Sequence, residues 1–223
     1  MVLATERQIL RKPTGHYVRC LSYYRSSCTL IYRWLFSAPT AAPLRTGRCK
    51  YRHNLLWRDG RVGYETCFHE AAHAVFARKV CGFYLQYVSA DESYCAAKAP
   101  VFSGYADHWR RAMYSLAGRF AEQLEIWGEI RPDSWEKFWE EAVIEAEDES
   151  IRGDTFDLME DLYGMGNPEE EYTVVVSDTE ETMRELWPEI TAVAENLMER
   201  GRLEGDEVVR IIEHAREQRE RGG

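Results

Sequence analysis

The chain of 223 residues is 45% hydrophobic and 30% charged, with a formal net charge of -10. This length is enough to bury a core without disulfide bonds, and the ordinary apolar content predicts a globular fold. The charge is unevenly divided: residues 1–55 carry ten Lys and Arg against one acidic residue, so the remaining 168 residues carry a net charge of -19. The negative charge of residues 56–223 argues against the binding of nucleic acid to their surface.

Residues 1–60 are expected to form a basic, poorly structured arm, because they lack helical or strand periodicity. Three interpretations remain open: an organelle transit peptide, a tail that binds nucleic acid or a membrane surface, or a stretch translated from a wrongly chosen start codon. The best apolar run, residues 30–44, is broken by Arg33 and contains two prolines. It therefore predicts no membrane span.

The six cysteines form no C-x-x-C pair, and no convincing secretion signal precedes them. They are interpreted as free thiols in a reducing compartment. We therefore expect a cytoplasmic protein, or an organelle-targeted one if the arm is a transit peptide.

Residues 61–218 have the pattern of amphipathic helices, with apolar residues at i, i+3, i+4 and i+7. Two β-rich runs, 82–89 and 172–176, are predicted to be short strands, whereas 94–104 is ambiguous. The sequence thus predicts a mainly α, multihelical domain with a small β element, followed by a disordered tail at 219–223. In chain order, the expected helices cover 64–80, 107–127, a stretch after Pro132, 155–163, a long segment from Ser177 to Gly201, and 206–219.

Local signals indicate two helix starts and explain one glycine. Asp133, with Glu136 three residues later, has the pattern of a capping box for the third helix. Ser177, with Glu180 three residues later, has the same pattern at the start of the long helix. Gly118 costs about 1 kcal/mol relative to Ala inside a helix, which indicates close packing against another helix.

The run His69-Glu70-Ala71-Ala72-His73 spells H-E-x-x-H within the first expected helix. Histidines at i and i+4 lie one above the other, so both imidazoles can bind one zinc ion. When bound, Zn²⁺ would lower the pKa of a water to about 7 and polarise a carbonyl, and Glu70 would accept the water's proton. The pattern predicts a metallopeptidase. The alternative is a pair of histidines hydrogen-bonded at the edge of a core, beside a solvated Glu70.

A catalytic zinc site needs a third protein ligand, and sequence spacing alone does not choose it. The candidates with suitable side chains are Glu122, Asp154, Asp157, His108 and His214.

Several segments over about residues 63–213 resemble, in the same order, the protease domain of the FtsH-type zinc metallopeptidases. Residues 69–74 resemble its H-E-A-G-H-A, 117–123 its G-G-R-A-A-E-E, 126–129 its F-G-E, 153–158 its G-A-x-N-D-L, and 197–208 its C-terminal helices. This resemblance implies a zinc ion held by His69, His73 and Asp157, with Glu70 as the general base. Glu122 would support helix packing or the ligands. The chain departs from the family at Ala72 and Phe156, and in a longer connection at 131–152.

The ATPase module of that family has no counterpart here, because the chain contains no Gly-Lys pair and hence no P-loop. We therefore expect a zinc-dependent endopeptidase for unfolded or flexible polypeptides, with a separate ATPase as a candidate partner and a homo-oligomer as a candidate assembly. Two alternatives stay open. One is a phage-type regulatory metallopeptidase that cleaves a repressor, with Glu122 as the third ligand; the other is a non-catalytic zinc-binding or adaptor module.

Overall fold

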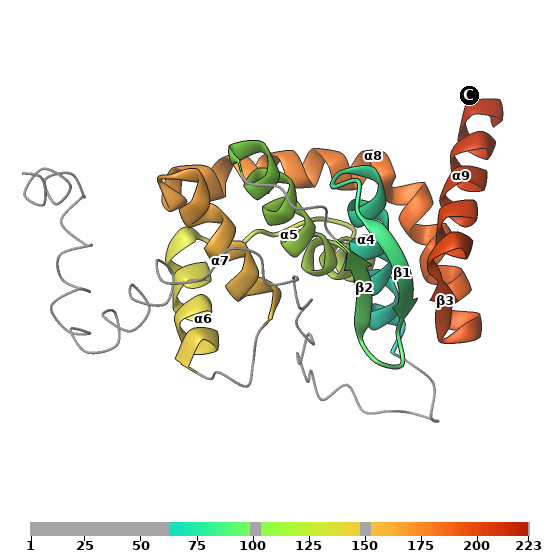
Figure 1. Cartoon of the computed structure of the whole chain (residues 1–223), viewed down its shortest axis with the longest axis horizontal. Coiled ribbons are helices and arrows are strands. Elements are labelled where there is room, and N and C mark those ends of the chain that lie inside the picture. The colour runs from blue at the N-terminus through green and yellow to red at the C-terminus, as the bar shows by residue number, and fades with distance from the viewer. Residues whose placement is uncertain (1–62, 99–103, 148–152, 223) are drawn as a thin grey trace, which may run out of the picture. The chain divides into compact units, whose positions relative to one another are not determined.

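The computed structural model describes residues 63–98, 104–147 and 153–222. By its contacts the chain divides into two units, Met1–Thr40 and Ala41–Gly223, and every described residue belongs to the second. The basic arm expected at residues 1–60 lies outside the described residues. Within them the fold is mainly helical with one small antiparallel sheet, which confirms the predicted fold class at that level (Figure 1).

Helix α4 (Tyr64–Lys79) carries the H-E-x-x-H sequence and matches the predicted helix at 64–80. Every residue from Cys67 to Ala77 is buried, because α5 (Tyr105–Trp127), α8 (Pro168–Arg200) and the sheet all pack against this helix. Alanine at four of these positions allows such close approach. The expected single apolar stripe is therefore only part of the buried surface, and the histidines lie inside the fold rather than at its edge.

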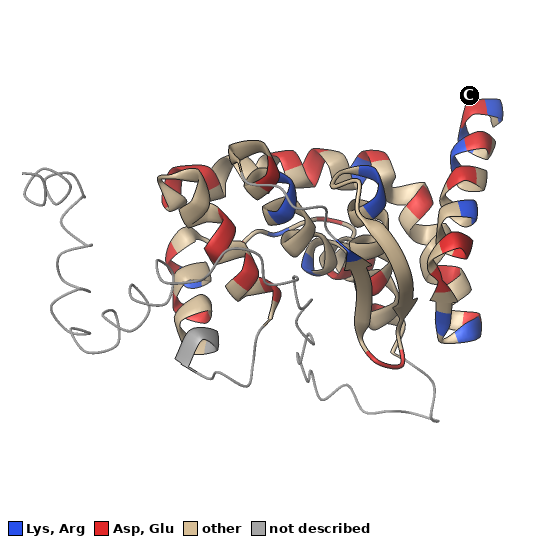
Figure 2. Ribbon diagram, in the orientation of Figure 1, with Lys and Arg blue, Asp and Glu red and all other residues tan. Residues whose placement is uncertain are grey.

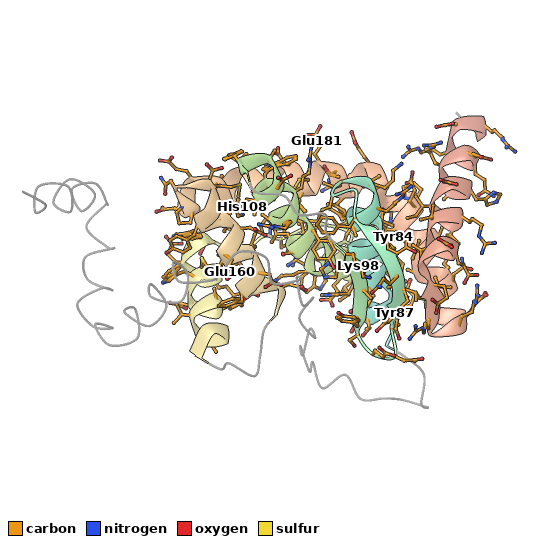
Figure 3. The ribbon with its side chains drawn as sticks, viewed as in Figure 1. Tyr84, Tyr87, Lys98, His108, Glu160 and Glu181 are labelled. Carbon is orange, nitrogen blue, oxygen red and sulfur yellow. The ribbon has the colours of Figure 1, made fainter. Side chains whose placement is uncertain are left out.

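The sheet has the strand order β2-β1-β3, and both pairs are antiparallel. Strand β1 (Tyr84–Ser89) was predicted, whereas β2 (Tyr94–Lys98) falls in the ambiguous stretch and β3 (Arg202–Glu204) had no sequence signal. Val88 in the central strand pairs with Cys95 on one side and Leu203 on the other. Figure 3 shows Tyr84, Tyr87 and Lys98 along β1 and β2.

Helices α5, α6 (Trp135–Glu147) and α7 (Asp154–Met165) follow the predicted order. The predicted cap of α6 is wrong by one residue, because Ser134 occupies that position. Its carbonyl accepts the Phe138 amide at 2.9 Å, and its hydroxyl accepts the Lys137 amide at 3.4 Å. Asp133 instead forms ion pairs with Arg119 of α5 and with Lys137. Residues 148–152, between α6 and α7, lie outside the described part of the chain.

The long helix α8 begins at Pro168, so the predicted strand at 172–176 and the predicted capping box at Ser177 are both wrong. Proline at the first helical position suits a helix start, and three glutamates follow it. The β-branched run is helical because Tyr172 and Val175 are buried in the core from one helix face. Tertiary packing here overrides local β-propensity. At its other end α8 stops at Gly201, which has a φ of 69° as predicted for a helix-ending glycine.

The final helix α9 (Gly205–Gly222) starts against the sheet. A Cβ on Gly205 would overlap the carbonyl oxygen of Leu85 in β1, so only glycine lets the chain turn from β3 into α9 at this distance. The helix continues three residues beyond the expected end at Arg219. Acidic side chains are spread along the helices rather than gathered on one of them (Figure 2). None of the described helices is long and apolar enough to cross a membrane.

Candidate metal centre

The two histidines of the H-E-x-x-H sequence converge inside the fold. His69 and His73 are 6% and 4% exposed, and their Nε2 atoms lie 3.1 Å apart. One helical turn separates them, which brings their ring centroids within 4.8 Å. The arrangement places both nitrogens on the side of α4 that faces α5 and the start of α7.

Asp154 completes the cluster from the first turn of α7. Its Oδ2 atom lies 3.1 Å from His73 Nε2 and 3.3 Å from His69 Nε2. The three atoms therefore form a nearly equilateral triangle. Zinc bonded at about 2.0–2.1 Å in a tetrahedral site requires ligand atoms about 3.3 Å apart, so the triangle has the size of one face of such a site. These are the residues that the described part of the chain offers as a three-residue metal cluster.

The cluster contains Asp154 where the resemblance implied Asp157. Both residues lie in the first turn of α7, and residues at i and i+3 face the same side of a helix on successive levels. The difference is therefore a register difference of one turn, and it arises where the connection from α6 is longer than the FtsH-type pattern. Asp154 belonged to the candidate ligands from spacing, whereas His108 and His214 lie elsewhere.

Those two other histidines have their own partners. His108, which is labelled in Figure 3, lies on α5. Its Nδ1 atom lies 2.8 Å from the Asp161 carboxylate of α7. His214 on α9 is exposed and lies 2.8 Å from the side-chain nitrogen of Gln218. Neither therefore contributes to the cluster.

Glu122 of α5 contacts His69 on the side away from the triangle. Its Oε1 atom lies 2.9 Å from His69 Nδ1. A carboxylate only accepts hydrogen bonds when it is ionised, so this contact holds the proton on Nδ1 and leaves the Nε2 lone pair directed at the triangle. This is the supporting position that the resemblance implied for Glu122, and it is the contact that commonly orients metal-binding histidines.

Gly118 provides the space beside the triangle. A Cβ on this residue would lie 2.5 Å from His69 Nε2 and 2.6 Å from His73 Nε2. The predicted close packing of Gly118 against another helix is thus confirmed, and the surface that it contacts is the pair of Nε2 atoms of His69 and His73. A side chain of any size on α5 would fill the space that an ion beside these atoms needs. Two imidazoles and one carboxylate are a donor set that fits zinc.

The other ring nitrogen of His73, Nδ1, has different surroundings from Nε2. Nδ1 is buried, and it has no hydrogen-bond partner among the described residues. The ring packs instead against Tyr114 of α5, with centroids 4.7 Å apart. Because no neighbour holds the proton on Nδ1, His73 can also carry it on Nε2 and donate it to Asp154. The same triangle therefore suits an ion or a hydrogen-bonded pair, and metal binding is the observable that separates them.

The two carboxyl groups near the histidines, those of Glu70 and Asp154, have pKa values shifted in opposite directions. Burial raises the pKa of the Glu70 carboxyl to about 7, although the imidazoles of His69 and His73 oppose the rise. Burial also tends to raise the pKa of Asp154, but His73 and His69 outweigh it and hold that pKa well below its ordinary value. Asp154 is therefore an anion suited to a cation, and Glu70, 2% exposed, is a carboxylate suited to proton transfer.

A cavity of about 90 Å³ adjoins the cluster on the His69 and Asp154 side. Its lining comes from α4, α5, α6, α7, α8 and the segment before α6: His69, Ser115, Leu116, Arg119, Phe120, Glu122, Gln123, Asp133, Phe138, Asp154, Thr155, Leu158 and Tyr172.

The sequence matches no protein-family model and no curated protein sequence. The site described above therefore rests on its own geometry. Sequence reasoning named His69, His73, Glu70, Glu122 and Asp154 among the candidates, although it preferred Asp157 as the ligand. It did not single out Tyr114, which lies outside the apolar stripe predicted for this helix and packs against the ring of His73.

Proposed function

We propose that this protein is a zinc-dependent endopeptidase whose domain is of the FtsH type. The observation that carries the proposal is the triangle of His69 Nε2, His73 Nε2 and Asp154 Oδ2 beside the buried carboxylate of Glu70. Two imidazoles and one carboxylate are a donor set that catalytic zinc uses, with a further position left for water or substrate.

Each residue has one task in this proposal. His69, His73 and Asp154 hold the ion, and Glu122 fixes the tautomer and orientation of His69. When bound, zinc supplies a Lewis acid that polarises the substrate carbonyl and makes water acidic. Gly118 keeps the approach to the two nitrogens clear.

Glu70 is the general base. Its carboxylate takes a proton from the water as the water oxygen attacks the carbonyl carbon of the peptide bond. It then gives that proton to the leaving nitrogen as the C–N bond breaks, so one water is consumed and an amine and a carboxylic acid are released. A pKa raised to about 7 by burial is close to the value at which one group can both accept and return a proton near neutral pH.

The expected substrate is an unfolded or flexible polypeptide segment. His69 and His73 are more than nine-tenths buried, and Asp154 has a side chain 22% exposed. A folded surface would not reach atoms at this depth, whereas an extended chain can enter a narrow opening.

The test begins with metal content. The protein is stripped with a chelator, reloaded and measured for bound zinc, and we expect one zinc per chain. Asp154→Asn should lose it, whereas Asp157→Asn, one turn further along the same helix, serves as the matched control and should keep it. Zinc loss with Asp157→Asn but not with Asp154→Asn would restore the assignment that the resemblance implied.

The second measurement is cleavage of casein. Wild type should cleave it, and Glu70→Gln should bind zinc without cleaving. A wild-type protein that binds no zinc would end the proposal. Zinc bound without turnover of any unfolded substrate would favour the non-catalytic module instead, and cleavage that survives in Glu70→Gln would end the role given to that residue.

A further inference from the structure

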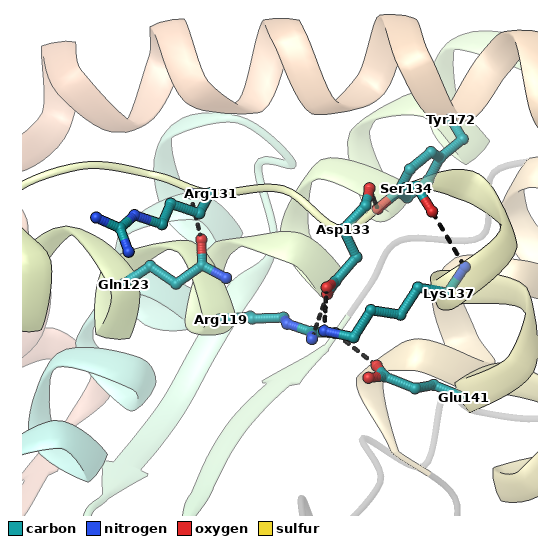
Figure 4. A network of polar contacts seen from close by, with 8 residues as sticks. All are labelled: Arg119, Gln123, Arg131, Asp133, Ser134, Lys137, Glu141 and Tyr172. Atoms are coloured by element: carbon teal, nitrogen blue, oxygen red, sulfur yellow. Dashed lines mark hydrogen bonds and ion pairs between the residues drawn. The ribbon is translucent and has the colours of Figure 1, made fainter.

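Most Lys and Arg side chains of the described residues lie against a carboxylate. Figure 4 shows this between α5 and the start of α6, where Arg119 contacts Asp133 and Glu141, and Lys137 also contacts Asp133. Similar pairs recur along α8 and α9. Acidic side chains greatly outnumber basic ones in this part of the chain, so each cation has many candidate partners. A cation without such a partner is therefore an exception here.

Three such exceptions lie on neighbouring elements. Arg78 and Lys79 are exposed in the last turn of α4, and Lys98 is exposed at the end of β2. None of the three forms an ion pair with another described residue. Arg110 of α5 joins them, because its side chain is 45% exposed and its one acidic partner among the described residues, Asp107, lies 3.7 Å away. These four cationic side chains are called the basic patch.

Contacts between the elements bring the members of the basic patch together. Cys81, two residues after Lys79, donates a hydrogen bond from its thiol to the Arg110 carbonyl oxygen at 3.3 Å. Tyr84, three residues further on and 63% exposed, is the register partner of Lys98 across β1 and β2. Figure 2 shows blue at the end of α4 and on the neighbouring turns of α5. The basic patch therefore spans the adjoining ends of α4 and β2 and the part of α5 that they contact.

The basic patch also adjoins the candidate metal centre. Tyr114 lies one helical turn after Arg110 on α5. Its ring packs against His73, with centroids 4.7 Å apart, and against Phe83 at 6.0 Å. An extended polypeptide advances about 3.3 Å per residue. A segment held on the basic patch can therefore reach the metal centre within a few residues.

We propose that the basic patch binds a short acidic stretch of a polypeptide. Its cations are exposed and close together, so carboxylates of such a stretch can pair with them without displacing an existing strong pair. The rest of the surface selects the kind of partner, because residues 56–223 carry a strongly negative net charge. A nucleic-acid duplex or an anionic membrane extends its negative charge over tens of ångströms and would be repelled outside the patch. Four successive acidic residues span only about 13 Å and can contact the patch alone.

The experiment uses the full chain after treatment with a chelator, so that cleavage does not intervene. The probe is a short peptide with four successive glutamates and a neutral fluorophore, and fluorescence anisotropy measures its binding. A peptide with four glutamines in their place is the reference. Wild type should bind the glutamate peptide at least about tenfold more tightly at low salt, and the difference should shrink as salt screens the charges. Lys79→Glu combined with Lys98→Glu should weaken binding of the glutamate peptide at least about tenfold.

The matched control is Arg216→Glu combined with Arg221→Glu on α9, which changes the net charge equally at exposed positions outside the patch. It should leave the affinity within about twofold. Residues 1–55 are also basic, so the comparison between the two double variants, rather than the wild-type affinity, tests the patch. Lys79→Gln combined with Lys98→Gln gives the same comparison, with a smaller loss, if the charge reversal prevents folding.

Two outcomes would overturn the proposal. One is equal affinity of the patch variant and the control variant for the glutamate peptide. The other is binding of a DNA duplex or of vesicles with anionic lipid that the patch variant loses while it keeps the peptide. None of these measurements needs zinc or Glu70, so failure of the peptidase proposal would leave this result standing.

Discussion

Replacement of Gly118 by Ala is the sharpest test of the candidate metal centre, because it adds one carbon where the structure has no room. The new Cβ would lie 2.5 Å from His69 Nε2 and 2.6 Å from His73 Nε2. Ordinary contact between such atoms needs about 3.5 Å, so each imidazole must retreat by about 1 Å. Metal sites tolerate ligand displacements of about 0.2 Å. We therefore expect zinc affinity to fall at least about 100-fold, which corresponds to about 2.7 kcal/mol.

The change in unfolding free energy of the metal-free Gly118→Ala protein is a second test of this packing. In an open helix position, Gly→Ala is stabilising by about 1 kcal/mol. At position 118 the overlap should cost about 1–3 kcal/mol, so the variant should be no more stable than wild type and up to about 2 kcal/mol less stable. Equilibrium urea unfolding measures this free energy, and competition with a chromophoric chelator measures the zinc affinity.

Gly164→Ala is the matched control. It adds the same carbon to a helix, at 2.5 Å from His108 Cε1, in the contact between α5 and α7. We expect a similar loss of stability with unchanged zinc affinity. A Gly118→Ala protein that is about 1 kcal/mol more stable than wild type and binds zinc normally would refute the placement of the two histidines against α5.

Three further predictions concern other parts of the structure. Glu122→Gln should weaken zinc binding about 10–100-fold, because it loosens the contact that orients His69; Glu125→Gln on the same helix should not, and chelator competition compares the two. In metal-free protein, Glu70→Gln should raise the free energy of unfolding above pH 7 by up to about 3 kcal/mol. The reason is that folding raises the pKa of the Glu70 carboxyl to about 7, so ionisation of this group destabilises the folded state as the pH rises from the unfolded to the folded pKa. Urea unfolding of both proteins at pH 4 and pH 8 should show the difference only at pH 8. Gly201→Ala should lower the thermal midpoint, because a φ of 69° costs a residue with a Cβ about 1–2 kcal/mol; an unchanged midpoint would count against the turn from α8 into β3.

The order of the helices could be predicted from the sequence, because each helix buries apolar residues that recur at helical spacing. Trp109 to Leu124 in α5 and Met183 to Leu197 in α8 repeat at helical spacing, and both segments are helical. The strand expected at 172–176 shows the limit of such reading. A run of Thr and Val has high local β-propensity, but its place in α8 depends on which of its side chains reach the core. Similarly, β3 is three residues long and exists through its pairing with β1, which is over a hundred residues away.

The residues of the candidate metal centre also form two groups: those that the sequence indicated and those that only the tertiary structure identified. By itself the sequence determined that His69 and His73 share one side of a helix, because a spacing of four residues is close to one turn whatever surrounds it. It also indicated Glu70 as the carboxylate beside them and Gly118 as a point of close contact. Only the tertiary structure decided that Asp154 rather than Asp157 meets both imidazoles, and that Glu122 contacts the far nitrogen of His69. Those choices depend on how α7 and α5 are rotated against α4, and helix rotation is set by packing between elements that sequence spacing does not record.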